Sequence, residues 1–177
     1  MREHRLQVKL KNTFNSCFAK SNKLRIGILG AISYVKGSKV LYDIIERIRK
    51  NKNNIEVIII GYTDIEYEGY VSEDRIVTMT GKYNNKRISD LLNKYQISFV
   101  MIPSICPETF SYTASEAVKS GYPILAFDIG ACAERIKKYN CGWTVKDISS
   151  EAMYSKCMEL ENNREEIINK ANNCLII

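Results

Sequence analysis

Residues 24–61 read LRIGILGAISYVKGSKVLYDIIERIRKNKNNIEVIIIG, a stretch whose pattern decides the fold class. The short apolar run Leu24–Leu29 ends at a glycine, which is typical of a strand. Ser38 can cap a following helix, because apolar residues then recur at spacings of three and four. The run Ile55–Ile60 is continuous and β-branched, as in a strand that is buried on both faces. The stretch therefore predicts a strand, a helix and a second strand parallel to the first.

The same alternation continues to the C-terminus. Residues 63–70 are acidic and rich in tyrosine, which predicts a loop. Further strands are predicted at 75–80, 97–102, 123–127 and 143–145. Helices are predicted at 88–95, 112–119 and 131–139, with one or two more after Ser149 or Ser150. Apolar strands that alternate with helices imply an α/β fold, a doubly wound, Rossmann-like parallel sheet that is covered on both sides.

The chain of 177 residues is long enough for one domain with a substantial core. Residues 1–22 are polar and weakly patterned, so we predict an N-terminal arm or linker there and one domain over residues 23–177. No apolar run approaches the roughly 18–20 residues of a membrane span, and residues 1–10 lack the apolar segment of a signal peptide. The net charge of +6 suits a protein that meets phosphates and does not require a nucleic acid.

Six cysteines and one histidine limit the chemistry. No two cysteines form a C-x-x-C pair, and His4 lies in the predicted arm, so a metal site is not expected. A single histidine in that position also argues against a Ser-His-Asp or Cys-His mechanism. A domain of this size folds without disulfides, which predicts reduced cysteines and a cytoplasmic protein.

In a doubly wound sheet, ligands bind beyond the carboxyl ends of the strands. The sequence predicts five such ends, at Gly30–Lys36, Gly61–Asp64, Gly81–Tyr83, Ser104–Ser111 and Asp128–Gly130. The glycines at these ends allow a backbone to approach a ligand closely, or they simply make tight turns.

The loop that starts at Gly30 carries one cation, Lys36, just before the predicted helix. A lysine beside a helix N-terminus can neutralise a phosphate whose oxygens accept hydrogen bonds from backbone amides. The loop contains neither the G-x-x-x-x-G-K-[ST] phosphate pattern nor the G-x-G-x-x-G dinucleotide pattern. Taken alone, Lys36 is more simply explained as a solvated surface lysine.

Two carboxylates stand eight residues apart, Glu108 in a predicted loop and Glu116 one turn inside the next helix. Glu108 can accept hydrogen bonds from a polyhydroxyl substrate, and Glu116 can hold two hydroxyls as a carboxylate holds a ribose diol. The amides of Ser111 and Tyr112, at the helix N-terminus, can bind a phosphate. Taken alone, each glutamate is also explained as a helix-dipole partner or a surface residue.

In this order, the two motifs resemble the donor-binding, C-terminal half of the family-4 (group 1) glycosyltransferases, which have the two-domain GT-B fold. That family shows a G-R-x-x-x-x-K-G loop and, later, an E-x(7)-E motif. Here the first motif runs from Gly30 to Gly37 and the second from Glu108 to Glu116. The resemblance covers about residues 24–145, which is most of the chain.

The resemblance implies retaining transfer of a sugar, of hexosyl type, from a nucleotide-diphosphate donor to a glycan, lipid or other acceptor, without a metal ion or cofactor. By position, Lys36 would contact the diphosphate, and Glu108 would contact the sugar and face the reacting centre. Glu116 would hold the ribose hydroxyls, and the segment 81–83 would lie near the base. The positions implied to bind the donor besides Lys36 and Glu108 are Gly30, Gly81, Lys82, Tyr83, Phe110, Ser111, Tyr112 and Glu116.

Two positions depart from the family pattern. Ala31 replaces the family's arginine, which removes one of two expected cations, and Ser111 stands where glycine is common. A GT-B enzyme also needs an N-terminal acceptor-binding domain, which residues 1–22 cannot supply. We therefore expect the isolated domain to bind its donor weakly and to turn over little.

Other interpretations stay open at this stage. A non-catalytic nucleotide- or sugar-binding domain is the alternative function, because Ala31 leaves the diphosphate with less positive charge. A flavodoxin-like signalling domain would need acidic residues after the first strand, and Gly30–Tyr34 has none. The basic run Arg135–Lys138 predicts a solvated helix face, with peripheral contact to an anionic membrane as the second interpretation.

Overall fold

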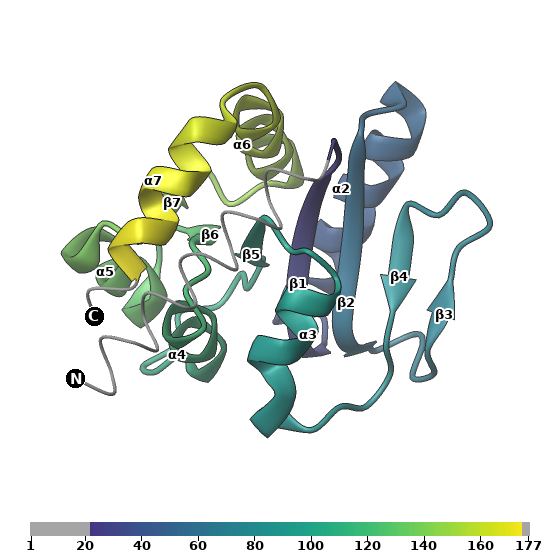
Figure 1. Cartoon of the computed structure of the whole chain (residues 1–177), viewed down its shortest axis with the longest axis horizontal. Helices are drawn as coiled ribbons and strands as arrows, with labels where there is room; N and C mark the ends of the chain where they lie inside the picture. Colours follow the sequence, from purple (N-terminus) through teal and green to yellow (C-terminus); the bar gives the residue numbers. More distant parts are fainter. Residues whose placement is uncertain (1–21, 175–177) are drawn as a thin grey trace.

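A computed structural model describes residues 22–174 of the chain (Figure 1). The predicted arm, apart from Asn22, lies outside the described residues, as do the apolar residues 175–177. Within the described part, no helix is both long enough and apolar enough to span a membrane.

The centre of the molecule is a seven-stranded sheet with the order β3-β4-β2-β1-β5-β6-β7. All neighbours run parallel except β3 and β4, which are antiparallel. The prediction of a doubly wound α/β fold is confirmed. The strands are β1 (Leu24–Ile32), β2 (Ile55–Thr63), β3 (Tyr70–Val71), β4 (Val77–Met79), β5 (Phe99–Ile102), β6 (Ile124–Phe127) and β7 (Gly142–Val145).

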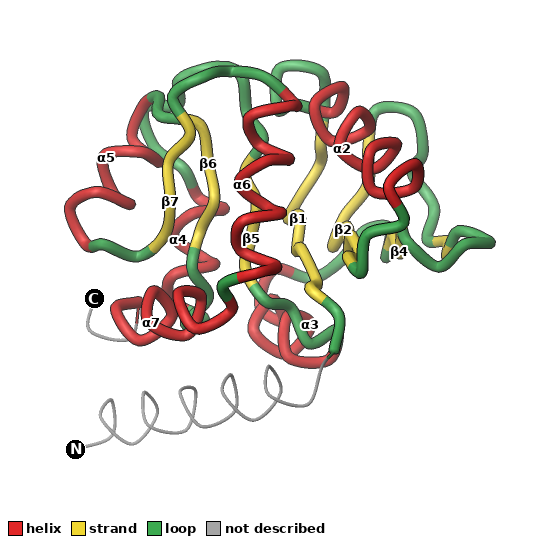
Figure 2. Tube along the Cα trace, turned by 90° about the horizontal axis from the view of Figure 1, so that it is seen from above, coloured by secondary structure: helices red, strands yellow, loops and turns green. Residues whose placement is uncertain are grey.

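Helices cover both faces of this sheet, and α2 and α3 lie on opposite sides of it (Figure 2). Helix α2 packs against α6, and α3 packs against α4. The helices are α2 (Ser38–Asn51), α3 (Ile88–Lys94), α4 (Tyr112–Lys119), α5 (Gly130–Tyr139), α6 (Ser150–Asn162) and α7 (Arg164–Cys174), with a 3-10 turn η1 (Asn85–Arg87) before α3.

Strands β1 and β2 form the longest pairing of the sheet, nine residues each in continuous register from Leu24–Ile55 to Ile32–Thr63. Both strands therefore extend past the glycines at which the sequence predicted their ends. Gly30 and Gly61 face each other in the ladder, and a Cβ on Gly61 would lie 1.9 Å from the Gly30 carbonyl oxygen. These glycines permit a close approach of two backbones and do not terminate the strands.

The start of α2 differs from the prediction that Ser38 caps it. The capping residue is Gly37, which has a left-handed backbone conformation (φ +85°). Helix α2 therefore begins without a hydrogen bond from a capping side chain. The buried Ser38 hydroxyl instead donates to the Asp64 carboxylate over 2.9 Å, which ties α2 to the loop after β2. A glycine at this place turns the chain sharply, so that Lys36 stays at the carboxyl edge of the sheet.

The core is formed by strand residues that are buried on both sides of the sheet, as the continuous apolar runs predicted. Trp143 is buried and meets Phe99 edge-on with ring centroids 5.9 Å apart, so it packs in the core. Among the described cysteines, Cys106, Cys132, Cys141, Cys157 and Cys174 are all free thiols.

The first turn of α6 offers a clean test of local stability. The Ser149 hydroxyl accepts a hydrogen bond from the Ala152 amide over 3.1 Å, so Ser149, and not Ser150, is the N-cap. We expect Ser149→Ala to lower the free energy of unfolding by about 1 kcal/mol and Tm by about 2–4 °C. Ser150→Ala is the matched control and should leave Tm unchanged; equal losses in both variants in thermal melts would contradict the capping role.

Candidate functional site

The carboxyl edge of the sheet holds a pocket of about 360 Å³, which we call the Glu116 pocket. It lies between the end of β1, the segment after β4 and the start of α4. The residues that line it are Gly30, Ala31, Tyr62, Lys82, Tyr83, Asn85, Tyr112, Thr113 and Glu116. Segments far apart in the sequence therefore bring together Gly30, Lys82, Tyr83, Tyr112 and Glu116, five of the residues that the family resemblance implies for donor binding.

A narrow recess of about 20 Å³ adjoins this pocket and contains the two residues predicted to be closest to the chemistry. Lys36 comes from the loop before α2, and Glu108 comes from the loop between β5 and α4. Ser111 and Thr113 line the same recess, and Thr113 also lines the Glu116 pocket. The two cavities are therefore neighbours at the first turn of α4, and we call the smaller one the Lys36–Glu108 recess.

Two of the predicted residues line neither cavity. Gly81 (φ +71°) follows β4 and lies against the backbone of Tyr67 and Gly69, as a turn glycine does. The ring of Phe110 is half exposed and meets the ring of Tyr112 edge-on at 4.9 Å between centroids. Their positions leave both residues at the rim of the site.

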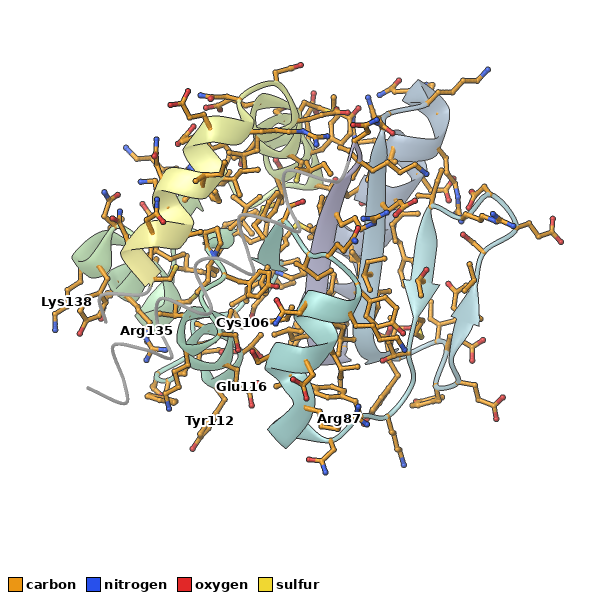
Figure 3. The ribbon with its side chains drawn as sticks, viewed as in Figure 1. Arg87, Cys106, Tyr112, Glu116, Arg135 and Lys138 are labelled. Atoms are coloured by element: carbon orange, nitrogen blue, oxygen red, sulfur yellow. The ribbon has the colours of Figure 1, made fainter. Side chains whose placement is uncertain are left out.

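Glu116 points from α4 into the pocket, near the lower end of the molecule as drawn in Figure 3. Burial raises the pKa of its carboxyl above the ordinary value, and Lys119 partly opposes this shift. Burial, and then the negative charge of Glu116, raises the pKa of Tyr83 to about 12. The pocket thus presents the carboxyl of Glu116 as an acceptor beside a phenol that stays protonated at neutral pH.

The start of α4 is well ordered by its own residues. Ser111 is buried, and its hydroxyl accepts a hydrogen bond from the Ala114 amide over 3.3 Å. Its side chain is therefore the N-cap of α4, which satisfies one of the amides that a helix start leaves without an internal partner. The positive end of the helix dipole faces the Lys36–Glu108 recess, where a phosphate would be stabilised.

The backbone of Glu108 is held by the start of α5, a contact that the sequence analysis missed. The Ala131 amide donates to the Glu108 carbonyl oxygen over 2.9 Å. At Gly130 (φ +62°) an added Cβ would lie 2.8 Å from the Glu108 nitrogen. The only signal in the sequence was the glycine after a predicted strand, and that glycine could equally have made a simple turn.

The loop that carries Lys36 rests on the segment after β5. The Ile105 amide donates to the Val35 carbonyl oxygen over 3.2 Å. At Gly37 the two backbones come so close that a Cβ would lie 2.0 Å from the Pro103 carbonyl oxygen. This contact sets Lys36 beside the Glu108 loop, which no local pattern in the sequence could specify.

Among residues 22–174, no group of three or more His, Cys, Asp or Glu side chains is arranged to hold a metal ion. The cationic group in the Lys36–Glu108 recess is Lys36. Cys132 lies under Glu108, and burial, with the charge of Glu108, raises the pKa of its thiol to about 12, which keeps it protonated.

Comparison with known proteins identifies the family. The profile of the family described as glycosyl transferases group 1 matches residues 11–174. The chain belongs to the group 1 glycosyltransferases. The resemblance seen in the motifs is thereby confirmed. No curated protein sequence matches the chain significantly.

Solved structures share the fold at low sequence identity. The C-terminal domain of a group 1 glycosyltransferase (LpcC) from Francisella tularensis is 19% identical, with a TM-score of 0.65, over 90% of this chain and 88% of that one. The catalytic domain of starch synthase IV from Arabidopsis thaliana, bound to ADP and acarbose, is 15% identical, with a TM-score of 0.67, over 97% of this chain and 39% of that one. Anabaena HepE, bound to UDP and glucose, is 16% identical, with a TM-score of 0.68, over 93% of this chain and 46% of that one.

The coverage of these structures defines what the chain corresponds to. This glycosyltransferase domain spans less than half of the starch synthase and of HepE, but nearly the whole of the Francisella C-terminal domain. Its fold is therefore that of the C-terminal domain of a GT-B glycosyltransferase.

Gly37→Ala tests whether the contact with Pro103 seats the Lys36 loop. Gly30→Ala is the matched control, since both glycines have similar positive φ (+85° and +100°) and a Cβ on Gly30 meets no atom within 4 Å. We expect Gly37→Ala to lower the free energy of unfolding by about 1–3 kcal/mol more than the control, because overlap adds to backbone strain. Urea denaturation measures the free energy of unfolding of both variants. Equal losses would show that the close approach of Gly37 to Pro103 does not constrain the Lys36 loop.

Glu116→Gln should raise the thermal stability at pH 7. Because burial raises the folded-state pKa of Glu116, folding favours the protonated form. That contribution to stability is complete below the unfolded-state pKa and is lost as pH rises through the folded-state pKa. Glutamine has no proton to lose, so the gain in Tm should be largest at pH 7 and shrink towards pH 4.

The control for this pH series is Glu73→Gln, because Glu73 is an exposed glutamate in the turn between β3 and β4. The Tm of Glu73→Gln should equal that of the wild type at every pH in the series. A Glu116→Gln variant that melts at or below the wild-type temperature at pH 7 would contradict the role of burial.

Proposed function

We propose that this domain binds a nucleotide-diphosphate sugar and presents it for retaining transfer of a hexosyl group. The observation that carries the proposal is that the two cavities meet at the first turn of α4, where both are lined by Thr113. The Glu116 pocket is large enough for a nucleoside, and the Lys36–Glu108 recess begins where its diphosphate and sugar would follow. Two structural neighbours were solved with ADP or UDP, which supports the same class of ligand.

In this proposal each predicted residue has a defined task. The Glu116 carboxylate accepts hydrogen bonds from the ribose hydroxyls, and the base lies towards Lys82 and Tyr83. Lys36 and the amides at the start of α4 stabilise the diphosphate. Glu108 accepts hydrogen bonds from the sugar hydroxyls and faces the reacting carbon.

For this reaction the site has to stabilise the negative charge that develops on the leaving group. The bond between the sugar carbon and the diphosphate oxygen breaks, and the diphosphate departs with the electron pair. An acceptor hydroxyl forms the new bond to the same face of the sugar, and its proton passes to the departing diphosphate. Lys36 and the dipole of α4 stabilise the negative charge that develops on the diphosphate, so the proposal requires no metal ion.

The acceptor, a glycan, lipid or other hydroxyl compound, belongs to a second domain in this proposal. The starch synthase catalytic domain and HepE are each more than twice as long as the part that this chain matches. We expect the 177 residues by themselves to bind the donor weakly and to transfer sugar slowly, because acceptor and donor must be held together for efficient transfer.

A non-catalytic nucleotide- or sugar-binding domain is the second candidate. It is favoured by Ala31, which lines the Glu116 pocket where the family carries an arginine. Such a domain would bind the donor through the same pocket and would not transfer its sugar.

A thermal-shift series tests donor binding. The chain is melted with UDP-glucose, GDP-mannose, ADP-glucose or dTDP-glucose, each at a concentration rising to the millimolar range. A ligand at ten times its Kd stabilises the fold by about 1.4 kcal/mol, which raises Tm by about 3–5 °C for a domain of this size. We expect one nucleotide class to give this shift and Glu116→Ala to abolish it.

Glu134→Ala is the matched control, since Glu134 is exposed on α5 and lines neither cavity. This variant should keep the full ligand-induced shift. Equal melting temperatures with every nucleotide sugar would contradict the proposed function. For an enzyme that carries this domain, Lys36→Met should lower kcat strongly, and an unchanged kcat would contradict the role of Lys36. Donor binding with no sugar transfer by the longer protein would favour the second candidate.

A further inference from the structure

The basic run 135–138 of α5 does not form the uniform solvated face that its sequence predicted. Lys137 pairs with Asp128, and the Lys138 ammonium lies 4.9 Å from the ring centroid of its neighbour Tyr139. Arg135 is different, because it is partly buried and lies beside α4 (Figure 3). Lys138 lies farther out on the same helix, away from α4.

The guanidinium of Arg135 contacts three groups at the junction between the Glu108 loop and α4. One of its nitrogens, Nη1, donates to the Ser111 carbonyl oxygen over 3.4 Å and to the Ser115 hydroxyl. Its central carbon lies 5.2 Å from the centroid of the Phe110 ring, a cation–π contact. A planar cation can make these directional contacts at once, since its donors form a fixed fork.

These contacts form a second connection between α5 and the Glu108 loop. The first connection is at the start of α5, where the Ala131 amide binds the Glu108 carbonyl oxygen. Arg135 supplies the second, one turn further along α5, at Phe110 and Ser111. The loop from Glu108 to Ser111 is therefore fixed to one rigid helix at both of its ends.

We infer that Arg135 is a positioning residue for sugar transfer, because its contacts with Phe110, Ser111 and Ser115 hold the Glu108–Ser111 segment where it meets the sugar and diphosphate of the donor. The inference rests on the proposed function, in which this segment faces the sugar. Arg135 itself lines neither the Glu116 pocket nor the Lys36–Glu108 recess, so it acts through the residues that it holds.

This role predicts a selective loss. The ribose and base contact the Glu116 pocket, which Arg135 does not line, whereas the sugar meets the segment that Arg135 holds. Loss of the guanidinium should therefore weaken the binding of the sugar diphosphate portion and leave the nucleoside portion unaffected. A merely structural role would lower the stability without separating these two portions.

The experiment compares Arg135→Met and Arg135→Lys with Lys138→Met in the full 177-residue chain. Lys138→Met is the matched control, since it removes a cation from the same helix at a position three residues beyond Arg135 and away from α4. Calorimetric titration gives Kd for UDP-glucose, GDP-mannose, ADP-glucose and dTDP-glucose and for the corresponding nucleoside monophosphates. Hydrogen exchange of the ligand-free chain reports on the amides of residues 109–116.

We expect Arg135→Met to raise the Kd of the bound nucleotide sugar about tenfold, the equivalent of one charge-assisted hydrogen bond. The Kd of the monophosphate should change less than twofold, and amides 109–116 should exchange faster. Arg135→Lys should restore part of the nucleotide-sugar affinity, because lysine keeps the charge over Phe110 but lacks the fork. Lys138→Met should match the wild type in every measurement.

Three results would overturn the inference, and they differ from one another. Unchanged exchange of amides 109–116 in Arg135→Met would show that Arg135 does not hold the segment. Equal weakening of nucleotide sugar and monophosphate would show a general structural role. Faster exchange in a chain whose wild type binds no nucleotide sugar would refute the proposed function and, with it, the role in sugar transfer, while leaving the contact itself established.

Discussion

The parallel pairing of β1 and β2 is the constraint on which the rest of the molecule depends. Nine residues of each strand run in register, and their apolar side chains are buried on both faces of the sheet. Parallel strands need a crossover helix, which places α2 across the sheet and brings both strand ends to one edge. The Gly30–Gly61 pair lies near that edge, where two backbones approach too closely for any side chain on Gly61. The loops that carry the candidate site all begin from this edge.

The candidate site is built mainly from backbone contacts between loops. Gly37 presses the Lys36 loop against Pro103, and Gly130 presses the start of α5 against the backbone of Glu108. Close packing of this kind constrains the loops more than exposed ion pairs would, because it leaves little free space around the two glycines. The recess between Lys36 and Glu108, which lies between these closely packed loops, is correspondingly narrow.

Charged groups contribute to the candidate site at a few positions. The net charge of +6 is distributed over the chain, and most described cations outside the site pair with carboxylates or aromatic rings, as Lys137 and Lys138 do. In the Lys36–Glu108 recess the positive charge comes from Lys36 and the dipole of α4. In the Glu116 pocket the carboxylate is partly buried beside Tyr83, which favours a ligand that donates hydroxyl hydrogens.

The sequence by itself determined the fold class, the order of the elements and most of the residues at the carboxyl edge. Hydrophobic periodicity is a local signal, so the strands and helices could be predicted from it. Glu108 and Glu116 stand out by their order and spacing and by the family resemblance, and the structure places them in neighbouring cavities. Strand ends were less predictable, since a glycine in a ladder and a glycine in a turn look alike. Only the tertiary structure decided that Gly37 caps α2 in place of Ser38, and that Arg135 turns towards the Glu108 loop. Those outcomes depend on which backbones meet in space, and no pattern within a single segment encodes such a meeting.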